Sequence, residues 1–232
     1  MSTLQAILKD FYIREKSLAD TVFLRQPFGD VWKTYTWKEA GEQARKMVTV
    51  LRNKGLKPGD HIALSSKNCS HWIIADLAIM IGGYVSVPVY ANLNKDQLNH
   101  ILKKSDSKMI FVGKLDEWDE MSNGIPEDFP IIKFPHHEGN AKVDRGEDWD
   151  QLIADAAPFE GEPLPDLDTL WTILFTSGTT GTPKGVMINH RNLSALITNE
   201  RKENDLGLYQ MKDPRFFSFL PMNHIAERVL VE

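Results

Sequence analysis

A ten-residue stretch, residues 176–185, contains the residue types that can bind a chain of phosphates. Its sequence, TSGTTGTPKG, combines three glycines, four threonines, one serine and one lysine. Glycine accepts positive φ angles and lets the backbone approach phosphate oxygens closely, and successive backbone N–H groups can form an anion-binding concavity. Lys184 adds a mobile positive charge, and Pro183 stiffens the chain before it. The pattern predicts a polyphosphate-binding loop.

This loop differs from the Walker A phosphate loop. The Walker A pattern has a glycine, four further residues and then Gly-Lys-Ser/Thr. Here Pro183 stands five residues after Gly178, and Gly185 follows Lys184. A surface hairpin rich in small polar residues is the remaining alternative. The apolar run at 170–175 predicts a buried strand that leads into the loop, and this favours phosphate binding over the alternative.

Two stretches resemble a known superfamily. Residues 175–186, FTSGTTGTPKGV, followed by NHRNL at 189–193, resemble the phosphate-loop signature of AMP-forming adenylating enzymes. That superfamily includes acyl-CoA synthetases, luciferases and the adenylation domains of peptide synthetases. Residues 219–228, FLPMNHIAER, resemble a segment of long-chain acyl-CoA synthetases. The first motif is specific to the superfamily, and the second favours its fatty-acid branch.

The resemblance implies an AMP-forming acid–thiol ligase. Such an enzyme joins a fatty acid to the α-phosphate of ATP, giving acyl-AMP and pyrophosphate, and then transfers the acyl group to CoA with release of AMP. Fatty acid, ATP and CoA are the implied substrates, and Mg2+ is the implied cofactor, held by a residue outside this chain. Three alternatives stay open: an aryl-CoA ligase, a peptide-synthetase adenylation domain and a non-catalytic nucleotide-binding module.

The resemblance also implies site residues. Lys184 and His224 are the implied catalytic residues, with His224 on the side of the pocket that faces the carboxylate and the nucleotide. The alternative for His224 is a structural role at a helix N-terminus. Arg228, one turn further on, is either a phosphate partner or half of a surface ion pair. The implied ATP-binding residues are Thr176, Ser177, Gly178, Thr179, Thr180, Gly181, Thr182 and Lys184.

Later motifs of the superfamily do not occur in this sequence. They are the Tyr-Gly-x-Thr-Glu segment whose glutamate assists magnesium, the aspartate that holds the ribose, the hinge and the lysine of the C-terminal domain. We therefore expect residues 1–232 to be the N-terminal portion of an AMP-binding domain, with the C-terminal domain absent. The chain alone is expected to be inactive, because phosphate charge must be neutralised from several sides at once.

Composition limits the compartment and the partners. The net charge of −5 argues against nucleic acid as a partner. The single cysteine, Cys69, excludes a disulfide framework and is expected to be a small buried residue at a helix start. Residues 1–20 lack the pattern of a signal peptide. We expect a cytoplasmic protein, and peripheral membrane association and homo-oligomerisation stay open.

Strands and helices alternate along most of the chain. Thr36 and Glu39 form a capping-box pattern that predicts a helix ending near Gly55. The apolar window 72–91 approaches the length of a membrane span, but Asp76 and the pair Gly82-Gly83 interrupt it, which favours a buried helix followed by a core strand. Further strands are expected at 61–65, 108–112, 186–188 and 215–220, and helices at 192–205 and from 225 onward. The alternation predicts an α/β fold with a parallel sheet flanked by helices.

Residues 113–168 form an acidic, proline-rich stretch. It contains sixteen Asp and Glu against four Lys and Arg, and six of the twelve prolines. This composition predicts a solvated, loosely organised excursion from the sheet, with a short strand at 131–134 and a short helix at 149–156. The run His136-His137-Glu138 is rejected as a metal site, because adjacent residues on a strand point apart.

Overall fold

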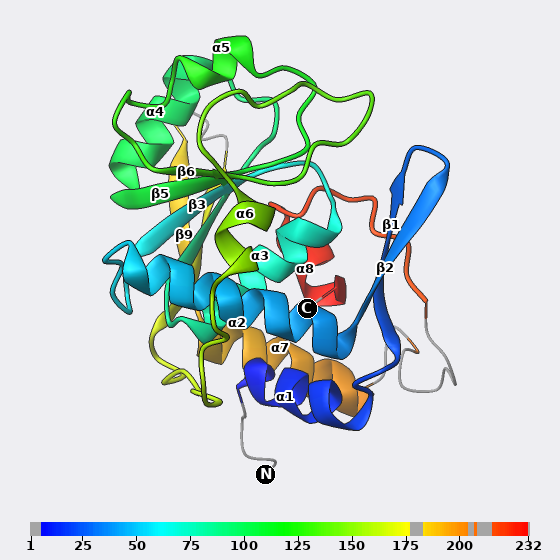
Figure 1. The fold of residues 1–232 in the computed structure, drawn as a ribbon. Coiled ribbons are helices and arrows are strands. Elements are labelled where there is room, and N and C mark those ends of the chain that lie inside the picture. Colours follow the sequence, from blue (N-terminus) through cyan, green and yellow to red (C-terminus); the bar gives the residue numbers. More distant parts are fainter. Residues whose placement is uncertain (1–5, 177–182, 204–206, 208–214, 232) are drawn as a thin grey trace.

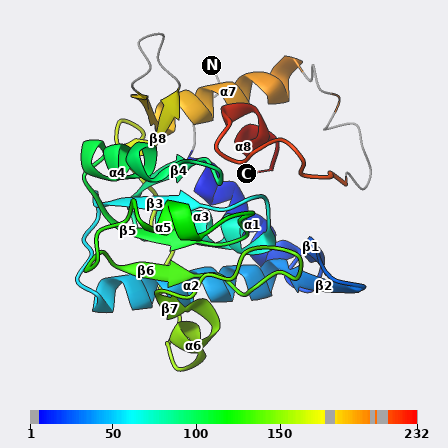
Figure 2. The same cartoon turned by 90° about the horizontal axis from the view of Figure 1, so that it is seen from above.

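A mostly parallel, seven-stranded sheet organises the protein. The computed structural model describes residues 6–176, 183–203, 207 and 215–231. The strands lie in the order β7-β6-β5-β3-β4-β8-β9, and Figure 2 shows them stacked in this order from β8 to β7. Among the described strands of this sheet, only the β8–β9 pair is antiparallel. The bounds are β3 His61–Ser65, β4 Val85–Val89, β5 Ser107–Val112, β6 Ile131–Lys133, β7 Glu147–Asp148, β8 Leu170–Thr176 and β9 Lys184–Asn189.

Helices cover both faces of this sheet, as the alternation of strands and helices predicts. Ile62 and Leu64 of β3 face a core built with the helices α1, α2, α3 and α6, whereas Ala63 faces a second core built with α4 and α5. Figure 1 shows α2 running beside α3 in front of the strands. The helices are α1 Ile7–Ser17, α2 Trp37–Asn53, α3 Ser70–Ile81, α4 Lys95–Lys104, α5 Asp119–Ser122, α6 Trp149–Ala154, α7 His190–Glu203 and α8 Ile225–Val231.

The apolar window that approached the length of a membrane span is protein core. It forms α3 and β4, and every residue of both elements is buried, Asp76 included. In the part of the chain that the structure describes, no helix is long and apolar enough to cross a bilayer. Cys69 is the N-cap of α3 and is buried, as expected, and its burial raises the pKa of the thiol.

The capping box predicted from Thr36 and Glu39 is confirmed. The Thr36 side chain accepts a hydrogen bond from Glu39 N, and the Glu39 carboxylate accepts one from Thr36 N, so the capping box starts α2. Ahead of it, β1 Val22–Phe28 and β2 Val31–Thr36 form an antiparallel hairpin that turns through Gly29 at φ 56°. The side chain of Gln26 accepts a hydrogen bond from Ser70 N, which ties this hairpin to the start of α3.

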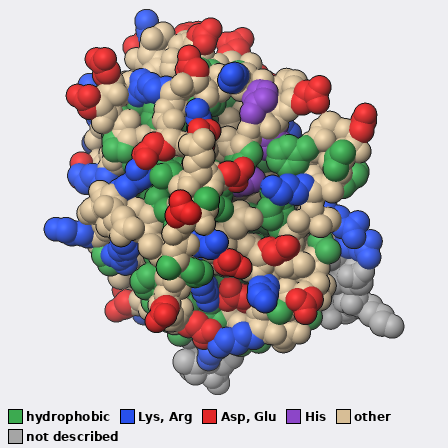
Figure 3. All heavy atoms as spheres, in the orientation of Figure 1, with side chains coloured by type: hydrophobic (Ala, Val, Ile, Leu, Met, Phe, Trp, Pro, Cys, Tyr) green, Lys and Arg blue, Asp and Glu red, His purple; other side chains and the backbone are tan. Residues whose placement is uncertain are grey.

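The acidic stretch 113–168 contains the short strand and the short helix that were expected, as β6 and α6, but it is not the loosely organised excursion that its composition predicts. It adds β6 and β7 to the sheet edge and buries Trp118 and Trp149. The apolar side chains spaced along it supply enough burial to order the chain. Its acidic groups pair with basic residues in Lys54–Glu147, Lys67–Asp116 and Lys133–Asp148. The face seen in Figure 3 accordingly mixes acidic and basic side chains rather than showing a field of one sign.

The strand predicted at 215–220 is wrong. These residues are described and have no strand conformation. A strand requires a neighbour that pairs with its backbone N–H and C=O groups, and no described strand lies in register with this segment.

Candidate functional site

Three parallel strands end at one edge of the sheet. Strands β3, β4 and β8 run in the same direction, so the residues that follow them lie at one edge of the sheet. Asn68 follows β3, Tyr90 follows β4 and Thr176 ends β8. Open α/β sheets bind ligands outside the carboxyl ends of their strands. We therefore treat this carboxyl edge as the candidate site.

The predicted phosphate loop is the connection of an antiparallel hairpin at this edge. Thr176, the last residue of β8, pairs with Lys184, the first residue of β9, and both are exposed. A Cβ atom on Gly185 would lie 2.9 Å from Ile173 Cγ2 and 3.2 Å from Phe175 Cζ, so close packing of β9 on β8 requires glycine there. The remaining predicted ligands, Ser177, Gly178, Thr179, Thr180, Gly181 and Thr182, lie outside the described residues.

His224 lies at the same edge, immediately before α8. Its Nε2 is 3.2 Å from Tyr90 Oη, and the two rings meet edge to face with their centroids 6.0 Å apart. Tyr90 directly follows β4, the strand that pairs with β8. The imidazole is exposed. It therefore remains accessible to a ligand, unlike a histidine that only fills the core.

Asn68 holds the segment that precedes His224. Its side-chain Nδ2 donates hydrogen bonds to Ser218 Oγ and to the Leu220 carbonyl, both at 2.7 Å. Its Oδ1 accepts a hydrogen bond from Met222 N at 3.2 Å. Sequence reasoning missed both Asn68 and Tyr90. The available signal was their position within three residues of the ends of two strands that were predicted to be parallel.

Arg228 is neither a phosphate partner nor half of a surface ion pair. It is fully buried, and its Nη2 donates a hydrogen bond to Asp76 Oδ2 at 2.6 Å. Its Nη1 donates to Thr172 Oγ1 at 2.8 Å. Both alternatives that the sequence left open for this residue are therefore excluded. The signal that could have found the pair was the lone carboxylate in the middle of an otherwise apolar helix.

His190 lies close to this ion pair. Burial lowers the pKa of its imidazole to about 4, the charge of Asp76 opposes that shift, and the charge of Arg228 adds to it. His190 starts α7, and its backbone N–H donates to the Thr169 carbonyl just before β8. At neutral pH the imidazole is therefore uncharged and acts as part of the packing beneath the loop hairpin.

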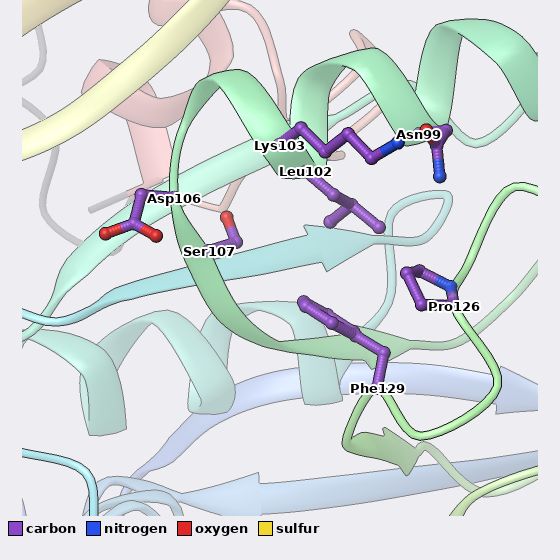
Figure 4. Close-up of a pocket in the computed structure, with 7 residues that line it drawn as sticks. All are labelled: Asn99, Leu102, Lys103, Asp106, Ser107, Pro126 and Phe129. Carbon is purple, nitrogen blue, oxygen red and sulfur yellow. The ribbon is translucent and has the colours of Figure 1, made fainter.

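A separate pocket of about 270 Å³ lies at the opposite edge of the sheet (Figure 4). One side of it is lined by Lys103 near the end of α4, by Asp106 in the following turn and by Ser107, which starts β5. Pro126 and Phe129 line the other side. Because β5 is parallel to β3, its first residue marks the amino edge. This pocket is therefore remote from the predicted phosphate loop, and we assign it no part in the site.

Magnesium ligands are not found in the described ranges. Within residues 6–176, 183–203 and 215–231, no three His, Cys, Asp or Glu side chains are grouped so that they could hold a metal ion. The buried carboxylate of Asp76 is already paired with Arg228. A magnesium ion has no set of carboxylate ligands here, so we assign it no residue and no step.

Comparison with known proteins places these observations in a family. The family model described as "AMP-binding enzyme" matches residues 14–232. Human long-chain-fatty-acid–CoA ligase 1 is 28% identical over 213 residues, which are 86% of this chain and 30% of that protein. This chain therefore spans about a third of the length of the curated relatives it matches.

Solved structures share the fold. A Rhodopseudomonas palustris structure described as a long-chain-fatty-acid CoA ligase superposes with a TM-score of 0.75 at 21% identity, over 98% of this chain and 54% of that one. The anthranilate CoA ligase AuaEII in complex with anthranoyl-AMP superposes with a TM-score of 0.68 at 15% identity, over 83% of this chain and 36% of that one. The loop hairpin, the sheet and the family match over nearly the whole chain agree: the chain belongs to the AMP-binding enzyme family of adenylate-forming ligases.

Proposed function

We propose that this chain forms the phosphate-loop part of a long-chain fatty acyl-CoA synthetase. The observation that carries the proposal is the convergence of the β8–β9 loop hairpin and His224 on one carboxyl edge of the sheet. The similarity to a human long-chain ligase and the FLPMNHIAER segment support the fatty-acid branch.

The reaction has two steps. A carboxylate oxygen of the fatty acid attacks the α-phosphorus of ATP, the bond to the bridging oxygen of pyrophosphate breaks, and acyl-AMP forms. The CoA sulfur, having lost its proton, then attacks the acyl carbon, and AMP leaves with the electrons of the C–O bond. Both steps place negative charge on phosphate oxygens, so positioned donors and cations accelerate them.

The residues of this chain would contribute in different ways. Lys184 and Thr176 flank the loop and would direct an ammonium group and a hydroxyl toward the β- and γ-phosphates, together with the loop residues between them. His224, held against Tyr90, would border the position where the carboxylate meets the nucleotide. Magnesium, when bound, would neutralise phosphate charge, and its ligands would come from outside the described residues.

The experiment uses the protein encoded by the complete gene. It is supplied with ATP, magnesium and CoA, and with fatty acids of graded chain length, benzoate, anthranilate and amino acids as separate substrates. Pyrophosphate release and thioester formation are measured for each. Thioester formation that is fastest with long-chain fatty acids supports the proposal.

Three other outcomes would contradict parts of it. Preference for benzoate or anthranilate would identify an aryl-CoA ligase, and pyrophosphate release with amino acids alone would identify a peptide-synthetase type of domain. Nucleotide binding without pyrophosphate release from any acid would leave a non-catalytic nucleotide-binding module.

We also propose where the protein lies in the cell. We expect a cytoplasmic protein that contacts membranes only at their surface, because its substrates partition into bilayers and its apolar window is buried. After cell fractionation, salt or mild alkali should release any membrane-bound fraction. Release by detergent alone would contradict this expectation.

A further inference from the structure

Four residues from four different elements form a closed, buried hydrogen-bonded ring, which the backbone carbonyl of Ser86 completes. Arg228 of α8 donates to Asp76 of α3 at 2.6 Å and to Thr172 of β8 at 2.8 Å. Ser86 Oγ of β4 donates to the other oxygen of Asp76 at 2.6 Å, and Thr172 Oγ1 donates to the Ser86 carbonyl at 2.9 Å. All four residues are fully buried.

The ring lies where the loop hairpin joins the rest of the sheet. Ser86 and Thr172 are register partners between β4 and β8, and β8 carries the hairpin that ends in the phosphate loop. Thr172 is four residues before Thr176. At the other end of the ring, the backbone N–H of Arg228 donates to the carbonyl of His224 at 3.3 Å. Arg228 therefore connects the strand of the loop, through its side chain, to the helix turn that begins with His224, through its backbone.

Aromatic rings fix the orientation of the Arg228 guanidinium. Its central carbon lies 4.0 Å from the ring centroid of Trp171 and 5.4 Å from that of Trp72. A planar guanidinium can stack on an indole while its two terminal nitrogens bond to different acceptors, and an ammonium cannot do both. The geometry thus requires arginine rather than any cation.

Stability alone accounts poorly for this arrangement. The free energy needed to remove two charges from water offsets much of their attraction. Apolar residues of similar volume therefore often replace a buried ion pair without loss of stability. Apolar contacts are not directional, whereas each hydrogen bond of the ring fixes one element relative to another.

We infer that Arg228 is a positioning residue, which through Asp76 and Thr172 sets the place of His224 relative to the strand that carries the phosphate loop. The inference rests on the proposed function for its catalytic consequence, although the positioning itself is a property of this chain. Removing the ring should leave a folded protein in which His224 and the loop are out of register.

The activity test uses the complete gene product. The double variant Asp76→Leu/Arg228→Met replaces the pair with apolar side chains. Arg228→Lys keeps the positive charge but loses the planar guanidinium, whose two terminal nitrogens bond to different acceptors. We expect the double variant to melt within a few degrees of the parent. Its kcat for acyl-AMP formation should fall by about tenfold to a hundredfold, with the KM for ATP changed much less, because misplacement by about 1 Å costs that much rate. The kcat of Arg228→Lys should lie between that of the parent and that of the double variant.

A matched control is available at a distance from the site. Arg45 pairs with Glu15 at 2.8 Å and stacks on Tyr12 with 5.2 Å to the ring centroid, and it joins α1 to α2. The double variant Glu15→Leu/Arg45→Met should keep the parental kcat. If the folded Asp76→Leu/Arg228→Met protein also keeps the parental kcat, the ring has only a structural role and the inference is wrong.

A second measurement separates this inference from the proposed function. Histidine-labelled NMR spectra of the 232-residue chain compare the imidazole resonances of His224 and His100. Positioning predicts that the His224 resonances move or broaden in Arg228→Lys and in the double variant, while those of His100 stay in place. Unchanged His224 resonances in both folded variants would overturn the inference. Absence of ligase activity in the parent would refute the proposed function alone.

Discussion

At the scale of single residues, the candidate site combines exposed groups with a buried support. Lys184 and His224 are exposed, as groups that bind a ligand must be. Arg228 is fully buried beneath them and has its hydrogen-bond partners in place. Substitutions of the exposed residues should therefore affect the reaction more than the fold.

Lys184→Ala in the complete gene product tests this distinction. Loss of an ammonium group beside the phosphates should slow acyl-AMP formation by about tenfold or more, since each 1.4 kcal/mol of lost transition-state stabilisation is tenfold in rate. The melting temperature should change little because the side chain is exposed. Lys108→Ala, on the separate strand β5, breaks a surface pair with Asp106 and is the control. A parental rate of pyrophosphate release would exclude the role of Lys184.

His71 should make the chain sensitive to acid. It is buried between the rings of Tyr35, Phe134 and Trp149, and no described residue hydrogen-bonds to either ring nitrogen. Burial, with the nearby charges of Lys33 and His137, lowers its pKa to about 3. The unfolded chain therefore binds the proton more tightly, and stability is lost as the pH falls below about 6.5.

The size of the effect follows from that shift. Between pH 7 and pH 5, His71 alone should reduce the free energy of unfolding by about 2 kcal/mol. Urea denaturation at the two pH values measures the loss. In His71→Phe the loss should be smaller by that amount, whereas His136→Gln, an exposed control, should behave as the parent. An equal pH dependence in parent and His71→Phe would show that the folded imidazole accepts its proton without cost.

At the scale of elements, local signals and packing share the stabilisation. Helix α2 begins at a reciprocal capping box and places Ala44, Met47 and Leu51, all fully buried, against the core. Helix α3, in contrast, has no side-chain cap and is held by burial on all sides. The start of α2 is therefore the place where a single polar contact should have a measurable effect.

Thr36→Ala removes that cap. The N–H of Glu39 loses its acceptor, and the free energy of unfolding should fall by about 1 kcal/mol. Urea denaturation at pH 7 measures the change, with Thr34→Ala on the exposed face of β2 as the control. A change for Thr36→Ala no larger than that of the control would show that packing alone fixes the start of α2.

At the scale of the whole molecule, several large apolar side chains in the part of the sequence after β8 are exposed. Met187 on the edge strand β9 is 68% exposed, and Phe217 and Phe219 are 82% and 71% exposed. An edge strand also presents backbone groups that another chain can pair with. These surfaces favour contact with another protein surface, and a second copy of this chain is the partner that can be tested directly.

Self-association of the 232-residue chain tests this. Light scattering after size exclusion should show a mass that rises with protein concentration, and Met187→Lys should reduce the rise by placing a charge on the edge strand. Val31→Lys, at an equally exposed apolar position on the β1–β2 hairpin, should not. A chain that stays monomeric at every concentration would contradict the expectation.

The sequence by itself determined the features that depend on neighbours in the chain. The capping box, the helix and strand of the apolar window, the glycine-rich loop and the alternation of strands and helices are each set by residues a few positions apart. Local backbone preferences and hydropathy period indicate where such elements begin and end, although packing supplies most of their stability. The family resemblance of the loop rests on the same kind of continuous pattern.

The tertiary structure alone decided which distant residues meet. Asp76 and Arg228 are 152 positions apart, and Asn68 meets Met222 across 154. The acidic stretch joins the sheet, and 215–220 does not form a strand, because pairing depends on which edge is free and which core is open. A sequence pattern shows that a side chain is buried or that a strand is apolar, but it contains no information on the partner. That choice is made only when the whole chain packs.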